Sequence, residues 1–262
     1  MRITTTDQSA PMTSWNVVGD LPGTLDPAQY VMLGCHYDGH DISQGAGDPA
    51  SGAVAVLEAA RVLAQHVVEN AVSPLSCTIR FILWGVEEIG LLGSRQYVLQ
   101  HKSELDRIRF YLNMDAAGSA TNGRDIILNE WPQLEGLFKS YQSEMAADFL
   151  VGQSLHAFSD HFPFFMEGVP TGGIESVRRS LEGRGYGHTR YDTVDKVSQT
   201  GLREAAALAA RIALRVAGEE NWPVEKRSLQ AVTTLIDSPE YREERGLRRK
   251  VDELYAQVRP AK

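Results

Sequence analysis

Short apolar runs alternate with helix-length segments along the chain, and this alternation constrains the fold more than any other feature of the sequence. The apolar runs have the length of strands, and they cover residues 30–36, 78–84 and 109–114. The helix-length segments are rich in helix-forming residues, and they cover residues 51–68, 90–101, 131–147 and 198–217. Buried strands that are separated by helices form a mostly parallel sheet covered on both faces. The sequence therefore predicts an α/β fold with three layers: helix, sheet and helix.

The C-terminal part of the chain differs from the rest. The 262 residues suffice to bury the core of one α/β domain, and Gly218 is a stop signal for the last long helical segment. The tail beyond it is dense in mixed charge and shows no second core. We predict one domain over residues 1–218 and a helical extension over 219–262. The extension is expected to be a solvated surface helix or a contact for a partner or a second copy.

Composition excludes some classes of partner. The formal net charge is −8 and the pI is about 5.4, whereas a nucleic-acid-binding protein needs a basic face. No run reaches the ~20 apolar residues of a membrane helix, and the first residues lack the apolar stretch of a signal peptide. We predict no nucleic acid partner and no membrane span, while a cytoplasmic protein and a trimmed secreted form both stay open. Cys35 and Cys77 cannot form a disulfide framework and are predicted to be buried.

Acidic residues and histidines follow the predicted strands where each strand ends. They lie at His36, Glu87–Glu88 and Asp115, with Asp48 before a helix and His188 in a later loop. Ligands in open α/β sheets collect at the carboxyl ends of the strands. Each group alone is commonplace, because an Asp after a strand often caps a helix and acidic pairs often begin one. Together, however, the carboxylates would repel one another at one edge. Two divalent cations would remove that repulsion.

Five stretches of the sequence resemble, in order and at suitable spacing from about Asn16 to Leu208, the successive motifs of metallopeptidase family twenty-eight. They read HYDGHDISQGAGDPASGAVAVLEAARVL, RFILWGVEEIGLLGSRQY, NMDAAG, SDHFPFFMEGVP and GHTRYDTVD. The family includes di-zinc aminopeptidases, plasma glutamate carboxypeptidase and glutaminyl cyclase. The resemblance implies a zinc exopeptidase-like fold with a mixed, mainly parallel sheet between helices, and it makes residues 1–218 a catalytic domain. The tail lies outside it.

The resemblance also implies the ligands of two zinc ions. His36 and Asp115 would bind one ion, Glu88 and His188 the other, and Asp48 would bridge both with one carboxylate oxygen each. Imidazole and carboxylate donors suit zinc without any thiolate.

Three further roles are expected, the first two from the same resemblance and the third from proximity in sequence alone. Glu87 would be the general base that takes a proton from the attacking water and passes it to the leaving amine. Asp38 would bind no metal but would hydrogen-bond the far ring nitrogen of His36, with a loop cap as its alternative role. Tyr186, close to His188 in sequence, is a candidate donor to the oxyanion.

The segment Ser159-Asp160-His161 has two interpretations. Asp160 and His161 either border the substrate pocket, as the matching segment of the family does, or Ser159 simply caps the helix that follows. The remaining loop residues have no spacing that demands chemistry and are predicted to be surface residues; they are His40, Asp41, His66, His101 and His156.

Proline follows the proposed bridging aspartate, at a position where relatives usually have Asp, Asn or a Gly-like residue. We predict that the Asp48–Pro49 bond is cis, because the family has a cis bond at this point and proline makes it least costly. The alternative is a trans bond, with Pro49 in the first turn of the helix.

The motifs favour an aminopeptidase that hydrolyses peptides, and they leave other functions open. A dipeptidase or carboxypeptidase would need an arginine for the free carboxylate, and three candidates follow one another in VRRSLEGRG: Arg178, Arg179 and Arg184. A glutaminyl cyclase-like acyl transferase needs only one working zinc, which the full ligand set argues against. A non-enzymatic binding module would have no reason to keep Glu87.

Overall fold

The computed structural model describes residues 4, 6, 10–70, 75–117, 123–176, 185–243, 245, 246, 248–250 and 253. Within these residues, seven strands form one sheet in the order β1-β3-β2-β4-β7-β5-β6. The strands are β1 (Val17–Leu21), β2 (Asp26–His36), β3 (Cys77–Trp84), β4 (Ile108–Asn113), β5 (Arg124–Leu128), β6 (Val151–Gln153) and β7 (Thr171–Ser176). Two pairings, β1 with β3 and β5 with β7, are antiparallel and the others are parallel. The predicted mixed, mainly parallel sheet is confirmed.

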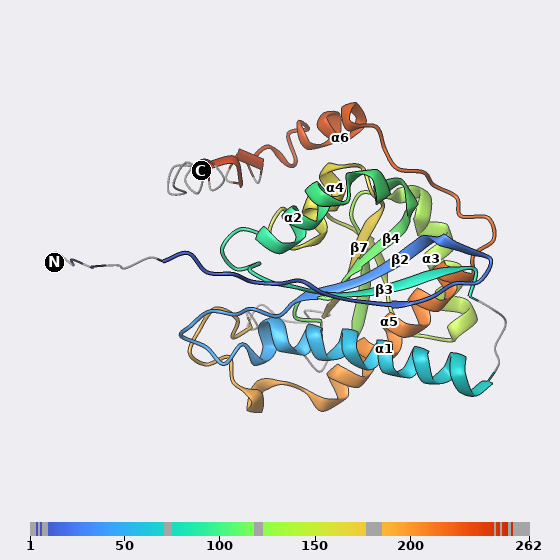
Figure 1. Ribbon diagram of the computed structural model, residues 1–262, viewed down its shortest axis with the longest axis horizontal. Helices are drawn as coiled ribbons and strands as arrows, with labels where there is room; N and C mark the ends of the chain where they lie inside the picture. The colour runs from blue at the N-terminus through green and yellow to red at the C-terminus, as the bar shows by residue number, and fades with distance from the viewer. Residues whose placement is uncertain are drawn as a thin grey trace.

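Helices cover both faces of this sheet (Figure 1). They are α1 (Ser51–Asn70), α2 (Leu92–Gln100), α3 (Pro132–Met145), α4 (His161–Met166), α5 (Gln199–Gly218) and α6 (Leu229–Ile236). Residues of α1, α3 and α5 share one hydrophobic cluster with strand residues such as Leu33 and Leu112. Residues of α2 and α4 share a second cluster with strand residues such as Met32 and Tyr111. The three-layer α/β architecture is thus the predicted one.

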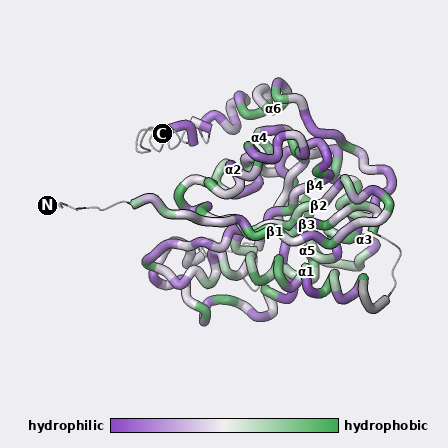
Figure 2. Tube along the Cα trace, viewed as in Figure 1, coloured by the Kyte–Doolittle hydropathy of each residue, from purple (hydrophilic) through white to green (hydrophobic). Residues whose placement is uncertain are grey.

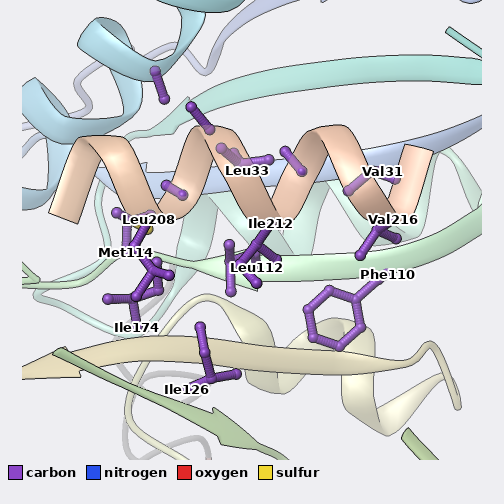
Figure 3. Packing of buried hydrophobic residues seen from close by; sticks show 14 of the residues in the cluster. Val31, Leu33, Phe110, Leu112, Met114, Ile126, Ile174, Leu208, Ile212 and Val216 are labelled. Carbon is purple, nitrogen blue, oxygen red and sulfur yellow. The ribbon is translucent and has the colours of Figure 1, made fainter. Parts of the chain in front are cut away.

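The core forms where the apolar face of a helix packs against apolar side chains of the strands. Leu208, Ile212 and Val216 follow one another at four-residue intervals on α5, so they lie on one side of the helix. Figure 3 shows this side over the strands that carry Leu33 and Phe110. The alternation of hydrophobic and hydrophilic residues along α1 in Figure 2 is that of a helix with one face on a sheet. None of the described helices is long and apolar enough to cross a membrane.

The C-terminal tail packs onto the body of the protein. Val232 and Ile236 of α6, with Tyr241, belong to a third hydrophobic cluster that also contains Leu91 and Phe165. This packing concerns α6, which precedes the charged segment beginning at Ser238, and the expectation of a solvated surface helix for that segment stays a prediction. The domain boundary at residue 218 stays a prediction.

Candidate metal centre

The carboxyl ends of β2, β3 and β4 meet at one edge of the sheet. His36 is the last residue of β2 and pairs in register with Trp84, the last residue of β3. Glu87 and Glu88 follow in the next turn, and Asp115 lies two residues beyond β4. All three strand ends thus bring acidic or imidazole groups to the same level.

Two loops complete the cluster. Asp48 lies in the short turn Ala46–Ala50 before α1, and His188 lies in the loop before α5. One carboxylate oxygen of Asp48, Oδ1, is 3.2 Å from Nε2 of His36, while the other, Oδ2, is 3.2 Å from Nε2 of His188. Asp115 Oδ1 lies 3.4 Å from His36 Nε2, and Glu88 Oε2 lies 3.1 Å from His188 Nε2. The five residues predicted as ligands therefore form two sets that share Asp48.

The polar atoms of the cluster are arranged for cations. Buried Asp48 Oδ1 and Glu88 Oε1 have no hydrogen-bond partner among the described residues, although imidazole nitrogens lie nearby. Buried oxygens in this condition are costly unless a further partner is present. Two imidazole-carboxylate sets with no thiolate have the donor chemistry of zinc sites. The residues fit a pair of divalent metal ions.

Electrostatics point the same way. Burial raises the pKa of Glu87 to about 9, and the carboxylates of Asp160, Asp115 and Glu88 add to this. Burial likewise raises the pKa of Glu88, with Asp48 as the next cause. Burial lowers the pKa of His36, but hydrogen bonds with the surrounding aspartates outweigh it and hold that pKa well above its ordinary value. Without metal ions, bound protons offset the negative charge of the crowded carboxylates. Bound metal ions would offset the same charge in their place.

Asp38 has the alternative role given to it from the sequence, that of a loop cap. Its carboxylate accepts hydrogen bonds from the backbone N–H groups of Glu87 (2.9 Å) and Glu88 (3.2 Å). The ring nitrogen Nδ1 of His36 instead donates to the main-chain carbonyl of Asp38 at 2.9 Å, while the carboxylate is 3.8 Å away. Asp38 thus bonds the far ring nitrogen of His36 as predicted, but through its main-chain carbonyl, while its carboxylate is only an ion-pair neighbour of that nitrogen. Two residues after a strand, the backbone carbonyl reaches the ring first.

A chain of hydrogen bonds runs from the core to Asp115. Trp84 Nε1 donates to the Tyr111 hydroxyl (2.7 Å), which donates to Asn113 Oδ1 (2.8 Å). Asn113 Nδ2 donates to Ser159 Oγ (2.7 Å), and Ser159 Oγ donates to Asp115 Oδ2 (2.8 Å). Every donor points toward the carboxylate, which orients it and favours its charged form.

The segment after Ser159 is buried beneath the site. Ser159 bonds Asp115, and the residue at the start of α4 is Asp160, whose side chain makes no capping bond. Burial raises the pKa of Asp160 to about 7 and lowers the pKa of His161 to about 3. His161 donates from Nε2 to the carbonyl of His156 at 3.0 Å. The simple helix-cap interpretation of Ser159 is wrong.

Two residues that contact the cluster were given no role from the sequence. Nε2 of His40, predicted to be a surface residue, lies 3.0 Å from Glu88 Oε2, and its ring centroid is 4.4 Å from that of His188. Asp192 is buried and its carboxylate accepts from the backbone N–H groups of Gly47 (2.7 Å) and Asp48 (3.0 Å). His40 could have been found from its place four residues after His36, inside the ligand loop. The only sequence feature that could have pointed to Asp192 was its place in the GHTRYDTVD motif.

Other predicted features have mixed outcomes. The Asp48–Pro49 bond is cis, as predicted, and both Cys35 and Cys77 are buried free thiols. Tyr186 is about half exposed, and its role as an oxyanion donor stays a prediction. The three arginines proposed to bind a carboxylate, Arg178, Arg179 and Arg184, lie outside the described residues.

A cavity of about 260 Å³ opens over the cluster. The five predicted ligands and Glu87 line it, together with Gly90, Phe158 and Arg248. Glu87 is 8% exposed, so its carboxylate faces the cavity and little bulk solvent. A small substrate in this cavity would meet the predicted base and both ligand sets at once.

This fold and this donor set define the class of α/β proteins that carry two adjoining metal sites at the carboxyl edge of a mainly parallel sheet. The chain belongs to peptidase family M28, whose sequence profile matches residues 16–213.

Relatives and solved structures of that family are similar over most of the chain. Leupeptin-inactivating enzyme 1 of Streptomyces exfoliatus is 30% identical over 248 residues, which cover 88% of this chain and 55% of that protein. Aminopeptidase YwaD of Bacillus subtilis is 30% identical over 219 residues, 80% of this chain and 46% of that one. The solved structure of BSAP, a zinc aminopeptidase from Bacillus subtilis, is 27% identical with a TM-score of 0.66, and the match covers 79% of this chain and 50% of that chain. The chain therefore spans about half the length of the curated relatives it matches.

Proposed function

We propose that this protein is an exopeptidase that binds two zinc ions and removes N-terminal residues from peptides. One observation carries the proposal: the two carboxylate oxygens of Asp48 face different histidines, 3.2 Å from each. A carboxylate in that position could hold two metal ions, one with each oxygen. The names of similar proteins, among them an aminopeptidase and a zinc aminopeptidase from Bacillus subtilis, support zinc and the aminopeptidase activity.

The chain would divide the metal ligands as follows. His36 and Asp115 hold one ion, Glu88 and His188 hold the other, and Asp48 holds both. When bound, two zinc ions supply Lewis-acid chemistry, since they polarise a carbonyl and lower the pKa of a water.

Glu87 moves the proton in this proposal. Its carboxylate takes a proton from the attacking water and returns it to the amine nitrogen that leaves, so it ends the cycle unchanged. Asp38 fixes the backbone of Glu87 and Glu88 by accepting from both N–H groups. This lets two adjacent side chains serve two purposes, one toward the proton and one toward the metal. Burial of Glu87 excludes competing water.

Turnover and metal content test the proposal together. Purified full-length protein should contain close to two zinc ions per chain by elemental analysis, and chelation followed by zinc should abolish and restore hydrolysis of leucyl-anilide. The N-acetylated anilide is the matched control, because an aminopeptidase needs the free amine. Equal hydrolysis of both anilides would refute the aminopeptidase assignment. Full activity with one metal ion or none would refute the two-zinc mechanism.

A further inference from the structure

The C-terminal tail brings a positive charge into the wall of the catalytic cavity. Arg248 lies 35 residues beyond the family match, which ends at residue 213, yet it lines the same cavity as Glu87 and His188. Its side chain is buried, with the residue 6% exposed. Among the described residues that line the cavity, it is the one lysine or arginine.

Packing of the tail explains how Arg248 reaches this position. Backbone N–H of Arg227 donates to the carbonyl of Gly168 at 2.8 Å, and its guanidinium lies 3.7 Å from the centroid of the Trp131 ring. Beyond it, Val232 and Ile236 bury the apolar face of α6. Figure 1 shows α6 over α4, with the chain then running back across the molecule. Several independent contacts thus direct the tail toward the metal centre.

Two carbonyls from different loops orient the guanidinium. Nη2 of Arg248 donates to the carbonyl of Gly90 at 2.9 Å, and Nη1 contacts the carbonyl of Ala157 at 3.5 Å. Gly90 is tied to the base, since its N–H donates to the carbonyl of Glu87 at 2.8 Å. These bonds also anchor the tail, so a purely structural role explains them. They also hold the guanidinium in the wall of the cavity, where a bound substrate can reach it.

The charge balance of the cavity indicates what Arg248 is for. Four carboxylates line the cavity, from Asp48, Glu87, Glu88 and Asp115, and two divalent cations would offset their four charges. Arg248 adds one positive charge to the wall of this cavity. An amine needs no such charge, whereas a carboxylate is the complement of a guanidinium. The volume of about 260 Å³ is below the usual range for drug-sized ligands, roughly 300–1,000 Å³, and suits a short peptide.

We propose that Arg248 forms a subsite for a substrate carboxylate, so that the enzyme prefers short peptides that carry a carboxylate close to the scissile bond. The inference rests on the proposed exopeptidase function. The carboxylate has two possible sources: the free C-terminus of a dipeptide, or an acidic side chain on the residue after the scissile bond.

Paired substrates and two variants test the subsite. The zinc-loaded full chain is assayed with Leu-Gly against Leu-Gly-amide, and with Leu-Glu-amide against Leu-Gln-amide, to separate the two sources. In at least one pair the wild type should prefer the carboxylate member. Arg248→Met should lower kcat/KM for that member by about 10- to 100-fold, mainly through KM, as expected for loss of a charge-assisted hydrogen bond. The uncharged member should change less than about twofold, and Arg248→Lys should recover part of the preference.

The exposed neighbour Arg249 provides the matched control. Its side chain is 71% exposed and pairs with Glu253 at 3.5 Å, so Arg249→Met removes the same charge from the tail without touching the cavity and should leave both members unchanged. Equal losses for both members in Arg248→Met would make Arg248 a structural anchor alone. Equal hydrolysis of both members of each pair by the wild type would overturn the subsite without any variant.

A binding measurement separates this inference from the proposed function. Calorimetric titration uses reduced-amide analogues of Leu-Gly and Leu-Glu-amide, which cannot be hydrolysed, each beside its uncharged counterpart. Tighter binding of a carboxylate analogue to the wild type, lost in Arg248→Met, supports the subsite even if no peptide is turned over, in which case the exopeptidase proposal alone fails. Equal affinities within each pair would refute the subsite while leaving the exopeptidase proposal intact.

Discussion

Removal of the Ser159 hydroxyl should loosen the metal centre from below. Ser159 is fully buried, and its Oγ both accepts from Asn113 at 2.7 Å and donates to Asp115 at 2.8 Å. Ser159→Ala therefore removes the last link of the hydrogen-bond chain and leaves one buried amide donor without its acceptor. A hydrogen bond to a charged group contributes about 1.5–3 kcal/mol, and a buried unsatisfied donor costs about 1–3 kcal/mol.

These two losses appear in different measurements. The unsatisfied amide of Asn113 lowers the unfolding free energy of the metal-free protein, so urea unfolding should show a loss of about 1–3 kcal/mol. The freed carboxylate of Asp115 is less well oriented for a metal ion, so zinc affinity should fall by about 10- to 100-fold. Competition with a chelator of known zinc affinity measures the second quantity.

A surface serine supplies the control for this experiment. Ser140 is exposed, and its Oγ donates to the carbonyl of Leu137 at 2.8 Å on α3, so Ser140→Ala should change neither quantity. Zinc affinity of Ser159→Ala within about twofold of the wild type would refute the reasoning, even if stability fell, because Asp115 would then be held without Ser159.

Four further substitutions have separate expected outcomes. Glu87→Gln should lower kcat by about 100- to 10,000-fold with zinc content unchanged, whereas Glu88→Gln should lower zinc content; kinetics beside elemental analysis checks both, and exchanged phenotypes would reverse the two roles. Burial lowers the pKa of His161 to about 3, so between about pH 6.5 and 3 the unfolded chain binds a proton that the folded chain does not. The contribution of His161 to stability should be complete above that window and fall within it by up to about 1.4 kcal/mol per pH unit. Urea unfolding at several pH values should therefore show a shallower slope of unfolding free energy against pH for His161→Phe. Identical slopes in the two proteins would contradict the lowered pKa of His161. Val232→Ala should lower the unfolding free energy by about 2 kcal/mol, since Val232 lies on the buried face of α6. Urea unfolding that shows no measurable loss would mean that α6 does not pack against the body of the protein.

Three strands at the centre of the sheet were predictable from their apolar runs, and the other four strands were not. The segments 30–36, 78–84 and 109–114 became the central strands β2, β3 and β4, because an apolar run of that length is unstable anywhere else. β1 was missed, since most of its residues are exposed and it forms by pairing with β3. β6, with three residues, is too short to leave a pattern. In both cases the strand comes from its neighbour and not from its own composition.

The proposed metal ligands could be assigned from the sequence because they lie in motifs that resemble those of the family, whereas their supports depend on contacts between distant segments. The carboxylate of Asp192 meets the backbone of Gly47, 145 residues away along the chain. Arg248 meets Gly90 across 158 residues. No local pattern encodes such pairs, because only the folded sheet places the segments together. The pair of His36 and Asp38 is close in the sequence, but it follows the same rule. The Asp38 carboxylate accepts a hydrogen bond from the backbone N–H of Glu87, 49 residues further along the chain, and not from the ring of His36.

The backbone beside the metal centre is strained at three points. Val86, just before the base, has a φ of 62°, Ala116, just after Asp115, has 45°, and His188 itself has 60°. Residues with side chains adopt this region at a cost of order 1–3 kcal/mol each. These residues form tight turns that bring the acidic and imidazole side chains close together. Extended backbone after each strand would place the same side chains further apart.

Strain and crowded carboxylates both raise the free energy of the metal-free site, and the surroundings offset them. The hydrophobic cluster around Trp84 and Tyr111 lies directly below, and the same two residues begin the hydrogen-bond chain to Asp115. Gly34 makes room for that chain, since a Cβ there would lie 2.6 Å from the Tyr111 hydroxyl. A rigid core thus holds in place a set of acids that would otherwise separate. Metal ions would then bind to side chains that are already held in place, which is the condition for tight coordination with little reorganisation.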